Sequence, residues 1–353
     1  MLHRGEVVKV ALLSMYSFDE VRGGTELFTE HLRGAFQDVE VINYSSSGGN
    51  AIDLTRLSLE EARKGAAICR HFRRLHRHEH YDVVIANSTA GWCLGMSNHD
   101  IPMLNVFHFT MRGLADQVLR GTPGYVPSKY VSSVFEKLAS VGKTSVAVSA
   151  KVSRELWSLY RIRSKVIELG VDTERFRPLP QDKAREELGL EAERPICLFV
   201  GRADDTKGFD IVQEAVRQRP DIRFVCVTPS QIDDERLIVR RNVPNERMPL
   251  YYSAADVLLF PSRYESVGYV GLEAMACDLP VVASRTGIFE DLDDDGIGRI
   301  VPSWNASDHV EALDEVLSGS FHPRRVVERR YSMERFLGDY REAAVEAVES
   351  RRR

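Results

Sequence analysis

The sequence lacks any hydrophobic run long enough to cross a membrane. Among its 353 residues the longest uninterrupted apolar stretch is Ile196–Val200, whereas a spanning helix needs about 20 apolar residues. The first residues also lack the hydrophobic stretch and small-residue cleavage site of a signal peptide. Hydrophobic residues make up 43% and charged residues 28%, which excludes a disordered or collagen-like chain. We therefore expect a globular protein of the cytoplasm.

Cysteine is scarce and irregularly placed. The five cysteines form an odd count, lie at least 24 positions apart and include no C-x-x-C pair. This distribution excludes the disulfide framework of a small secreted domain and the paired ligands of a zinc site. We expect buried free thiols in a reducing compartment, at Cys69, Cys93, Cys197, Cys226 and Cys277.

The chain carries little net charge, but its two halves differ. The total is −5, divided as +3 over residues 1–175 and −8 over residues 176–353. Eight of the ten histidines lie in the first half, which therefore gains positive charge below about pH 6.5. Neither half has the basic excess of a duplex-binding protein, so we expect no nucleic-acid partner.

Short β-branched runs alternate with longer segments of helical period, the pattern of parallel strands joined by crossover helices. A polar stretch at 170–181, with one glycine and two prolines, separates two such series. The candidate strands are 7–13, 39–42, 82–86, 103–107, 145–148 and 166–168, then 196–201, 222–227, 237–240, 256–260, 281–283 and 298–301. The predicted fold class is α/β, with a doubly wound parallel sheet in each of two domains, at 1–170 and 171–331. A terminal helix with a basic tail follows at 332–353.

Ligands of open parallel sheets bind beyond the carboxyl ends of the strands, so we expect a site in a cleft between two such domains. The strand at 196–200 leads into a loop that holds Arg202 and Lys207 between Gly201 and Gly208. A planar guanidinium and a compact ammonium together suit a diphosphate. The spacing is not that of a Walker A loop. The alternative is a solvated polar loop.

A second loop follows the strand at 256–260 and leads into a helix. Free N–H groups of Val267, Gly268 and Tyr269 at the helix start would face an anion or sugar hydroxyls. Glu265 lies in the loop and Glu273 about one turn inside the helix, so the two carboxylates could accept hydroxyl groups from two ends of one polyhydroxylated ligand. Surface positions for both are the alternative, although the apolar surroundings of Glu273 argue against it.

These motifs resemble a known family. Glu265 and Glu273, separated by seven residues, follow Phe-Pro-Ser and precede Ala-Met-Ala, and this arrangement resembles the E-x7-E signature of retaining glycosyltransferases of family 4. The resemblance implies the GT-B fold, in which two Rossmann-like domains face each other across a cleft. Residues 201–208 are similar to that family's diphosphate loop and residues 171–178 to its interdomain linker. Gly23-Gly24 and Phe107-His108 are similar to its glycine-rich loop and sugar-facing histidine.

The resemblance implies retaining transfer of a sugar from a nucleotide-diphosphate sugar to a saccharide, lipid-linked or small-molecule acceptor. The nucleotide sugar is then a co-substrate, and no cofactor or metal is expected. Catalysis would rest on electrostatic stabilisation and positioning.

The same resemblance implies a role for each matching residue. Arg202 and Lys207 would grip the diphosphate, and Glu273 would take the ribose hydroxyls. Glu265 would hold the donor sugar together with the backbone of Ser266, Val267, Gly268 and Tyr269. Gly23 or Gly24 would approach the phosphate or the acceptor, and His108 would contact the sugar.

The sequence departs from the family pattern at two places. Thr228-Pro229-Ser230-Gln231 replaces a glycine-rich turn, which leaves recognition of the base open. Thr286-Gly287 stands in place of a Gly-Gly pair before Glu290, which leaves the sugar geometry open.

A basic stretch at 63–77 combines six Arg and Lys residues with apolar ones and predicts an amphipathic helix. Peripheral contact of residues 63–80 with the inner face of an anionic membrane is one interpretation, and a solvated crossover helix is the other.

Two further patterns could hold a metal ion. His76 and His80 lie one helical turn apart, and Asp291–Asp295 contains an Asp-x-Asp. The histidines have no further ligand beside them, and the aspartates precede a glycine, so surface positions are favoured for both.

Other function classes stay open at this point. A nucleotide-sugar epimerase or hydrolase can share the two-domain architecture, and so can a sugar-nucleotide-binding protein without catalysis. A dinucleotide dehydrogenase is disfavoured, because no strand is followed by G-x-G-x-x-G.

Overall fold

A computed structural model describes residues 8–16, 24–44, 57–96, 101–190, 193–293 and 296–352. The chain divides into two compact units. The first unit comprises Met1–Leu169 with Glu334–Arg353, and the second comprises Gly170–Met333. The terminal helix therefore belongs to the first unit by its contacts, although it follows the second unit in sequence.

A six-stranded parallel sheet forms the centre of the first unit, in the order β2-β1-β3-β4-β5-β6. Its strands are β1 (Lys9–Leu13), β2 (Asp38–Ile42), β3 (Val83–Asn87), β4 (Met103–Phe107), β5 (Thr144–Ala147) and β6 (Lys165–Val166). Its helices are α1 (Gly24–Arg33), α2 (Leu57–Glu79), α3 (Met111–Leu114), α4 (Ser133–Ser140), α5 (Ala150–Glu155) and α12 (Met333–Arg352). Three π-helical turns, Ala115–Leu119, Pro127–Ser132 and Leu156–Tyr160, interrupt this series.

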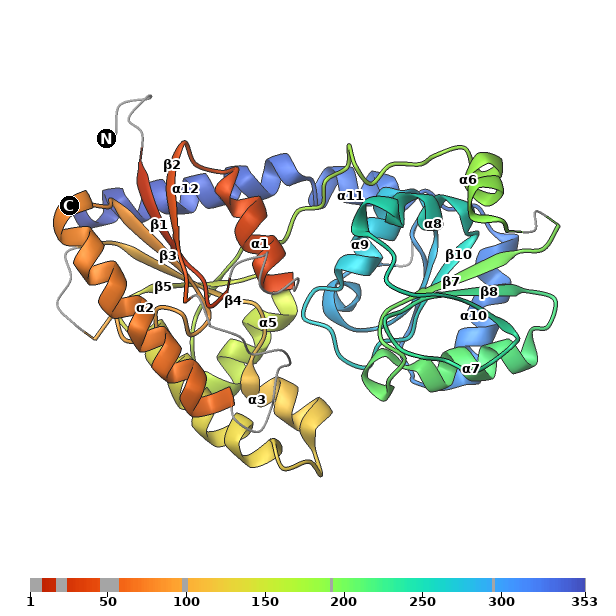
Figure 1. Cartoon of the computed structure of the whole chain (residues 1–353), viewed down its shortest axis with the longest axis horizontal. Coiled ribbons are helices and arrows are strands. Elements are labelled where there is room, and N and C mark those ends of the chain that lie inside the picture. Colours follow the sequence, from red (N-terminus) through yellow and green to blue (C-terminus); the bar gives the residue numbers. More distant parts are fainter. Residues whose placement is uncertain are drawn as a thin grey trace. The chain divides into compact units, whose positions relative to one another are not determined.

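Helices cover both faces of this sheet, which is why β3 and β4 are buried along their whole length and apolar except at Asn87 and Asn105. On one face, α2 packs Ile68, Cys69 and Phe72 into a core with residues of β1 and β3. Elsewhere in the unit, α1 and α12 meet through aromatic rings, with Phe28 of α1 5.6 Å from Phe336 and 5.5 Å from Tyr340. These ring contacts hold the terminal helix on the first unit, and Figure 1 shows the course of α12.

A second six-stranded parallel sheet forms the centre of the other unit, in the order β12-β11-β10-β7-β8-β9. Its strands are β7 (Ile196–Val200), β8 (Arg223–Val227), β9 (Leu237–Arg240), β10 (Val257–Phe260), β11 (Val281–Ser284) and β12 (Gly298–Val301). Its helices are α6 (Gln181–Leu188), α7 (Phe209–Gln218), α8 (Met248–Ala254), α9 (Tyr269–Ala276), α10 (Ala306–Ser318) and α11 (Arg324–Arg330).

Successive side chains of these strands point to opposite faces of the sheet. Cys197 and Phe199 of β7 pack with Val212 of α7 and Leu313 of α10 in one core, and α7 lies beside α10 on that face (Figure 1). Helices α8 and α9 contact the central strands β7, β10 and β11. The order of the strands places the carboxyl ends of β7, β10 and β11 next to one another, and this edge carries the candidate donor site.

The predicted fold class is confirmed, and each of the twelve candidate strands corresponds to a strand of the structure within a few residues. In the described part of the chain, no helix is both long and apolar enough to span a bilayer.

Candidate functional site

Three loops of the second unit, 201–208, 261–268 and 285–290, follow neighbouring strands and are joined by backbone hydrogen bonds. The N–H of Arg263 donates to Thr206 O (2.8 Å), and the N–H of Ile288 donates to Val267 O (2.9 Å). The N–H of Glu265 donates to the Thr286 hydroxyl (3.0 Å). The loops therefore form one connected surface at the carboxyl edge of the sheet.

Gly208 permits the close contact between the first two loops. Its φ is +66°, and a Cβ at this position would overlap the carbonyl oxygen of Pro261. Arg263 closes the same contact from the other side, because its guanidinium binds Asp205 O (2.6 Å) and both carboxylate oxygens of Asp210. Arg263 was not predicted as a site residue, since nothing local in the sequence marks an arginine whose partners lie more than 50 positions away.

Lys207 and Glu265 lie in contact and form an ion pair. Their side chains are 23% and 14% exposed, so the pair is partly shielded from water. The sequence predicted separate partners for them, the diphosphate for Lys207 and the sugar for Glu265. The structure brings the two side chains together at the junction of their loops.

Asp204 organises both predicted cations. Its Oδ1 accepts the Lys207 N–H (3.0 Å) and so caps the short helical turn, while its Oδ2 accepts from the Arg202 Nε (2.7 Å). The Arg202 side chain is 61% exposed. Asp204 was not predicted as a site residue, although an aspartate three residues before a helical lysine is a recognisable cap signal.

The turn that the sequence predicts to face an anion lies at the start of α9. Gly268 has φ +96°, precedes the first helical residue and packs against the Phe260 ring, where a Cβ would meet ring carbon at 3.2 Å. Within the described residues, the N–H groups of Val267, Gly268 and Tyr269 make no intramolecular hydrogen bond. Ser266 precedes this turn. The turn can therefore donate to a ligand.

Glu273 is buried on α9, at 7% exposure. The hydroxyl of Tyr252, on α8, donates to its Oε2 (2.7 Å). Burial raises the pKa of the Glu273 carboxyl to about 7, against the lowering effects of the Tyr252 hydrogen bond and the Arg175 charge. Glu273 is thus held in one orientation, with Oε1 left for a further donor.

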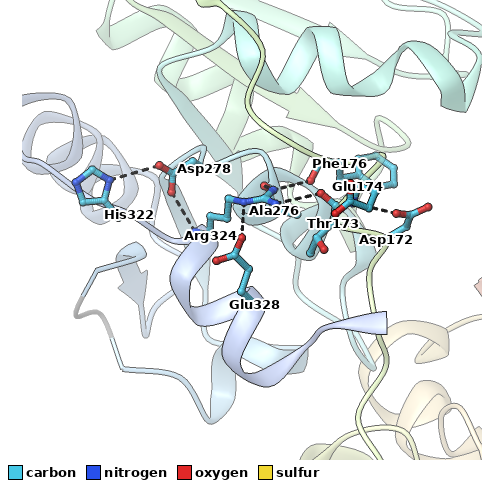
Figure 2. Close-up of polar contacts among 9 residues, drawn as sticks. All are labelled: Asp172, Thr173, Glu174, Phe176, Ala276, Asp278, His322, Arg324 and Glu328. Carbon is cyan, nitrogen blue, oxygen red and sulfur yellow. Dashed lines mark hydrogen bonds and ion pairs between the residues drawn. The ribbon is translucent and has the colours of Figure 1, made fainter. Parts of the chain in front are cut away.

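Arg324 of α11 anchors the other end of α9 (Figure 2). Its guanidinium donates to three backbone carbonyls, those of Thr173 (3.1 Å), Phe176 (3.0 Å) and Ala276 (2.5 Å). It also binds the Glu328 carboxylate at 2.7 Å. One side chain therefore ties the helix that carries Glu273 to the segment 172–176, a link between distant positions that the sequence analysis missed.

His108 follows β4 in the first unit and is buried, at 5% exposure. Its Nε2 lies 3.2 Å from Asn87 Oδ1, and its ring meets Phe28 edge-on. Because Asn87 Nδ2 donates to the Thr29 hydroxyl (2.8 Å), Asn87 Oδ1 is the acceptor and His108 carries its proton on Nε2. Burial lowers the pKa of His108 to about 3, so the ring is neutral and only Nδ1 can accept.

Gly24 is the first residue of α1, in the first unit like His108. Gly23 lies outside the described residues.

His76, one half of the histidine pair that could hold a metal, has a structural role at the end of α2. Its Nδ1 accepts the N–H of Tyr81 (3.1 Å), which occupies that ring nitrogen. In the described ranges no group of three or more His, Cys, Asp or Glu side chains could hold a metal ion. Residues 294–295, which belong to the acidic run, lie outside those ranges.

Comparison with known families matches both parts of the chain. Residues 25–175 match the family described as Glycosyltransferase Family 4, and residues 180–333 match the one described as Glycosyl transferases group 1. The chain belongs to the family 4 glycosyltransferases. The resemblance noted in the sequence is thereby confirmed.

Curated relatives of this glycosyltransferase include several named D-inositol 3-phosphate glycosyltransferase. The one from Xylanimonas cellulosilytica is 32% identical over 244 residues, which cover 60% of this chain and 58% of the relative. The one from Mycobacteroides abscessus is 28% identical over 275 residues, which cover 71% of this chain and 60% of the relative. The chain thus spans about three fifths of the length of these relatives.

Solved structures share the fold at low identity. Sucrose-phosphate synthase from Thermosynechococcus elongatus has a TM-score of 0.81 at 20% identity, covering 97% of this chain and 100% of that one. Anabaena HepE, in complex with UDP and glucose, has a TM-score of 0.70 at 17% identity, covering 96% and 100%. These likenesses establish that the glycosyltransferase has the two-domain GT-B architecture.

Proposed function

We propose that the protein transfers a sugar from a nucleotide-diphosphate sugar to an acceptor, with retention at the anomeric carbon. The observation that carries this proposal is the junction of three loops in the second unit. There an ammonium, a carboxylate and a turn of unpaired N–H groups lie on one connected surface. Together they match the charges and hydroxyls of an activated sugar.

Lys207 is the principal diphosphate ligand in this proposal. A diphosphate carries more negative charge than the single carboxylate of Glu265, so it can displace that carboxylate from the ammonium. Glu265 is then released toward the hydroxyls of the sugar that the same diphosphate carries. The ion pair thereby holds both side chains near their working positions before the donor binds.

Arg202 and the Gly268 turn complete the anion site. Arg202 is exposed, and its Nε binds Asp204 at the surface. Its side chain can therefore move onto a phosphate without breaking a buried contact. The N–H groups at 267–269 add donors that need no reorganisation. These groups stabilise the negative charge that grows on the leaving nucleoside diphosphate.

Glu273 is the ribose acceptor in this proposal. Tyr252 fixes its Oε2, and its Oε1 accepts from a ribose hydroxyl. His108 contributes a neutral Nδ1, which can accept a sugar hydroxyl without adding charge beside the reaction. Gly24, and Gly23 before it, would let the acceptor or the phosphate approach the start of α1.

The acceptor class is a saccharide, a lipid-linked sugar or a small molecule. Because curated relatives carry the name D-inositol 3-phosphate glycosyltransferase, a phosphorylated polyol is the first acceptor to test. No metal is needed in this scheme, since Lys207, Arg202 and backbone N–H groups supply the positive charge.

Peripheral contact with anionic lipid is a further part of the proposal. Helix α2 exposes Arg63, Arg70, Arg74 and Arg77, whose spacing places them on one side of the helix, while Ile68 and Phe72 are buried against the sheet. Liposome flotation tests it: binding to anionic vesicles at low salt that is lost at high salt supports contact at the inner membrane face. No binding at low salt leaves α2 as a solvated crossover helix.

The transfer itself is tested by nucleotide release from UDP, GDP and ADP sugars, with and without inositol phosphate and simple saccharides. We expect nucleotide release that depends on the acceptor and occurs with one class of donor. The product should keep the anomeric configuration of the donor sugar. Release without acceptor, with free or epimerised sugar as product, would instead identify a hydrolase or epimerase. Binding without release would identify a non-catalytic protein.

A further inference from the structure

The first unit contains two cysteines that lie together although 24 positions separate them. Cys69 is fully buried in the middle of α2, and Cys93 is half-buried in the segment 89–96 that follows β3. Cys93 packs against the core cluster that contains Cys69. The Cys69 thiol also lies 3.8 Å from the carbonyl oxygen of Ala90 in the same segment.

One face of α2 holds the segment 89–96 in place. The Trp92 indole N–H donates to Ala62 O (2.8 Å), and the Arg73 guanidinium donates to Cys93 O (3.3 Å). Between these positions Gly65 lets the segment approach closely, because a Cβ there would overlap Thr89 and Trp92. The segment that carries Cys93 is therefore held closely against the part of α2 that carries Cys69.

Positive charge surrounds Cys93. The Lys143 ammonium is largely buried and donates to Gly91 O and Ala139 O, both at 2.8 Å. Neither of these partners is a carboxylate, so its charge is not neutralised by them. Hydrogen bonding from Cys69 and the nearby charges of Arg73 and Lys143 lower the pKa of the Cys93 thiol to about 7. The same hydrogen bond raises the pKa of Cys69, which keeps its proton.

We propose that Cys69 and Cys93 form a peroxide-reactive dithiol that closes to a disulfide between α2 and the segment 89–96. Nothing in the transferase scheme uses either thiol, and the inference does not depend on that scheme. Cys93 is the attacking sulfur, because it is the more exposed of the two and lies beside the cations. Cys69 is the resolving sulfur.

The reaction balances with hydrogen peroxide as the oxidant. The Cys93 thiolate attacks one peroxide oxygen, the O–O bond breaks, and the departing hydroxide takes up a proton to become water. The sulfur of Cys69 then attacks the resulting sulfenic acid, an S–S bond forms, the S–O bond breaks, and the Cys69 proton leaves with that oxygen as water. Two thiols and one peroxide give one disulfide and two waters, with two electrons passing from sulfur to oxygen.

The three cysteines of the second unit provide an internal contrast. Cys197, Cys226 and Cys277 are buried, and burial raises the pKa of each thiol. They should stay reduced at peroxide concentrations that oxidise the pair.

The experiment treats the full chain with a small excess of hydrogen peroxide and counts thiols after unfolding. We expect the count to fall from five to three, with a mass lower by two hydrogen atoms and full reversal by dithiothreitol. Peptide mapping should join Cys69 to Cys93. The rate of thiol loss should rise through about pH 7, following the Cys93 thiolate.

Variants separate the two roles. Cys69→Ser should leave a Cys93 sulfenic acid that a dimedone reagent captures, and Cys93→Ser should keep all four of its remaining thiols. Cys277→Ser is the matched control and should still lose two. The proposal is overturned if wild-type protein keeps five thiols, gains oxygen without a cross-link, pairs other cysteines, or joins Cys93 to the Lys143 nitrogen through one oxygen atom.

Discussion

The Lys207 ammonium and the Glu265 carboxylate neutralise one another across two loops that lie 58 positions apart in sequence. One of them is proposed to bind the diphosphate and the other the sugar. Since the ammonium can face only one strong partner at a time, the carboxylate competes with the nucleotide. The two substitutions that break the pair should therefore have opposite effects on nucleotide binding.

Glu265→Gln should tighten the binding of the nucleoside diphosphate by a few fold, because it removes the competing charge. The same change should lower transfer by roughly 100-fold or more, since the sugar loses its anionic partner. Calorimetry with the nucleotide and initial-rate assays with the donor measure the two effects separately. Weaker nucleotide binding in this variant would show that Glu265 does not compete for Lys207.

Arg202→Ala should lower kcat/KM by roughly 10- to 100-fold, as expected for the loss of one charge-assisted phosphate contact. Arg236→Ala is its matched control. Arg236 binds Asp234 at 2.7 Å, two positions away, just as Arg202 binds Asp204, but it lies at β9 rather than in the loop after β7. Equal losses of kcat/KM in the two variants would mean that the effect comes from breaking a surface ion pair and not from losing a phosphate contact.

Glu273→Gln should change how stability depends on pH. The ordinary carboxyl pKa is 4.5 and that of folded Glu273 is about 7, so wild type loses stability as the pH rises between these values. Glutamine keeps an oxygen for Tyr252 and carries no charge. The variant should therefore gain about 3 kcal/mol relative to wild type between pH 4.5 and pH 7.5. Urea unfolding at both pH values measures this gain, and parallel pH profiles would contradict it.

His108 should remain neutral in the folded protein far below the usual range of histidine. Its pKa of about 3 lies below the ordinary 6.5, so the folded state loses stability as the pH falls through that interval. NMR of the ring protons should reveal no titration of His108 between pH 7.5 and pH 5. A His108 ring that protonates above pH 5.5 would place it in water rather than against Asn87 and Phe28.

Arg324→Met should destabilise the second unit by about 3 kcal/mol, because it leaves several carbonyls without their charged donor. It should also raise the KM for the donor, since α9 carries Glu273. Arg325→Met is the control, because Arg325 is the exposed neighbour on the same helix. If both variants unfold at the same urea concentration as wild type, Arg324 does not anchor α9.

Transfer should persist after dialysis against EDTA. The positive charge at the proposed site comes from Lys207, Arg202 and backbone N–H groups. Activity that disappears with the chelator and returns with magnesium or manganese would require a metal in the scheme.

Much of the architecture could be predicted because parallel strands buried on both faces leave a local signal. Runs such as Val-Val-Ile-Ala in β3 and Val-Leu-Leu-Phe in β10 are apolar without interruption, so the local sequence alone locates these strands. The packing of α12 on the first unit depends on ring contacts between Phe28 and residues 308 and 312 positions later, which no local pattern encodes.

The candidate site also has a part that local sequence predicts and a part that it does not. Motifs with a spacing visible in the sequence contain Arg202, Lys207, Glu265 and Glu273. Their partners are not: Tyr252 reaches Glu273 and Arg324 reaches Thr173 only because separate elements pack together. The pairing of Lys207 with Glu265 depends on the order of β7 and β10 in the sheet, which places their loops side by side.

The most direct test of the account is calorimetric titration of Lys207→Ala with the nucleoside diphosphate of the accepted donor, beside wild type and Arg236→Ala. We expect the Kd of Lys207→Ala to rise by roughly 10- to 100-fold, the equivalent of one charge-assisted hydrogen bond, and that of Arg236→Ala to stay within about twofold. Wild-type affinity in the folded Lys207→Ala protein would contradict the proposed diphosphate site.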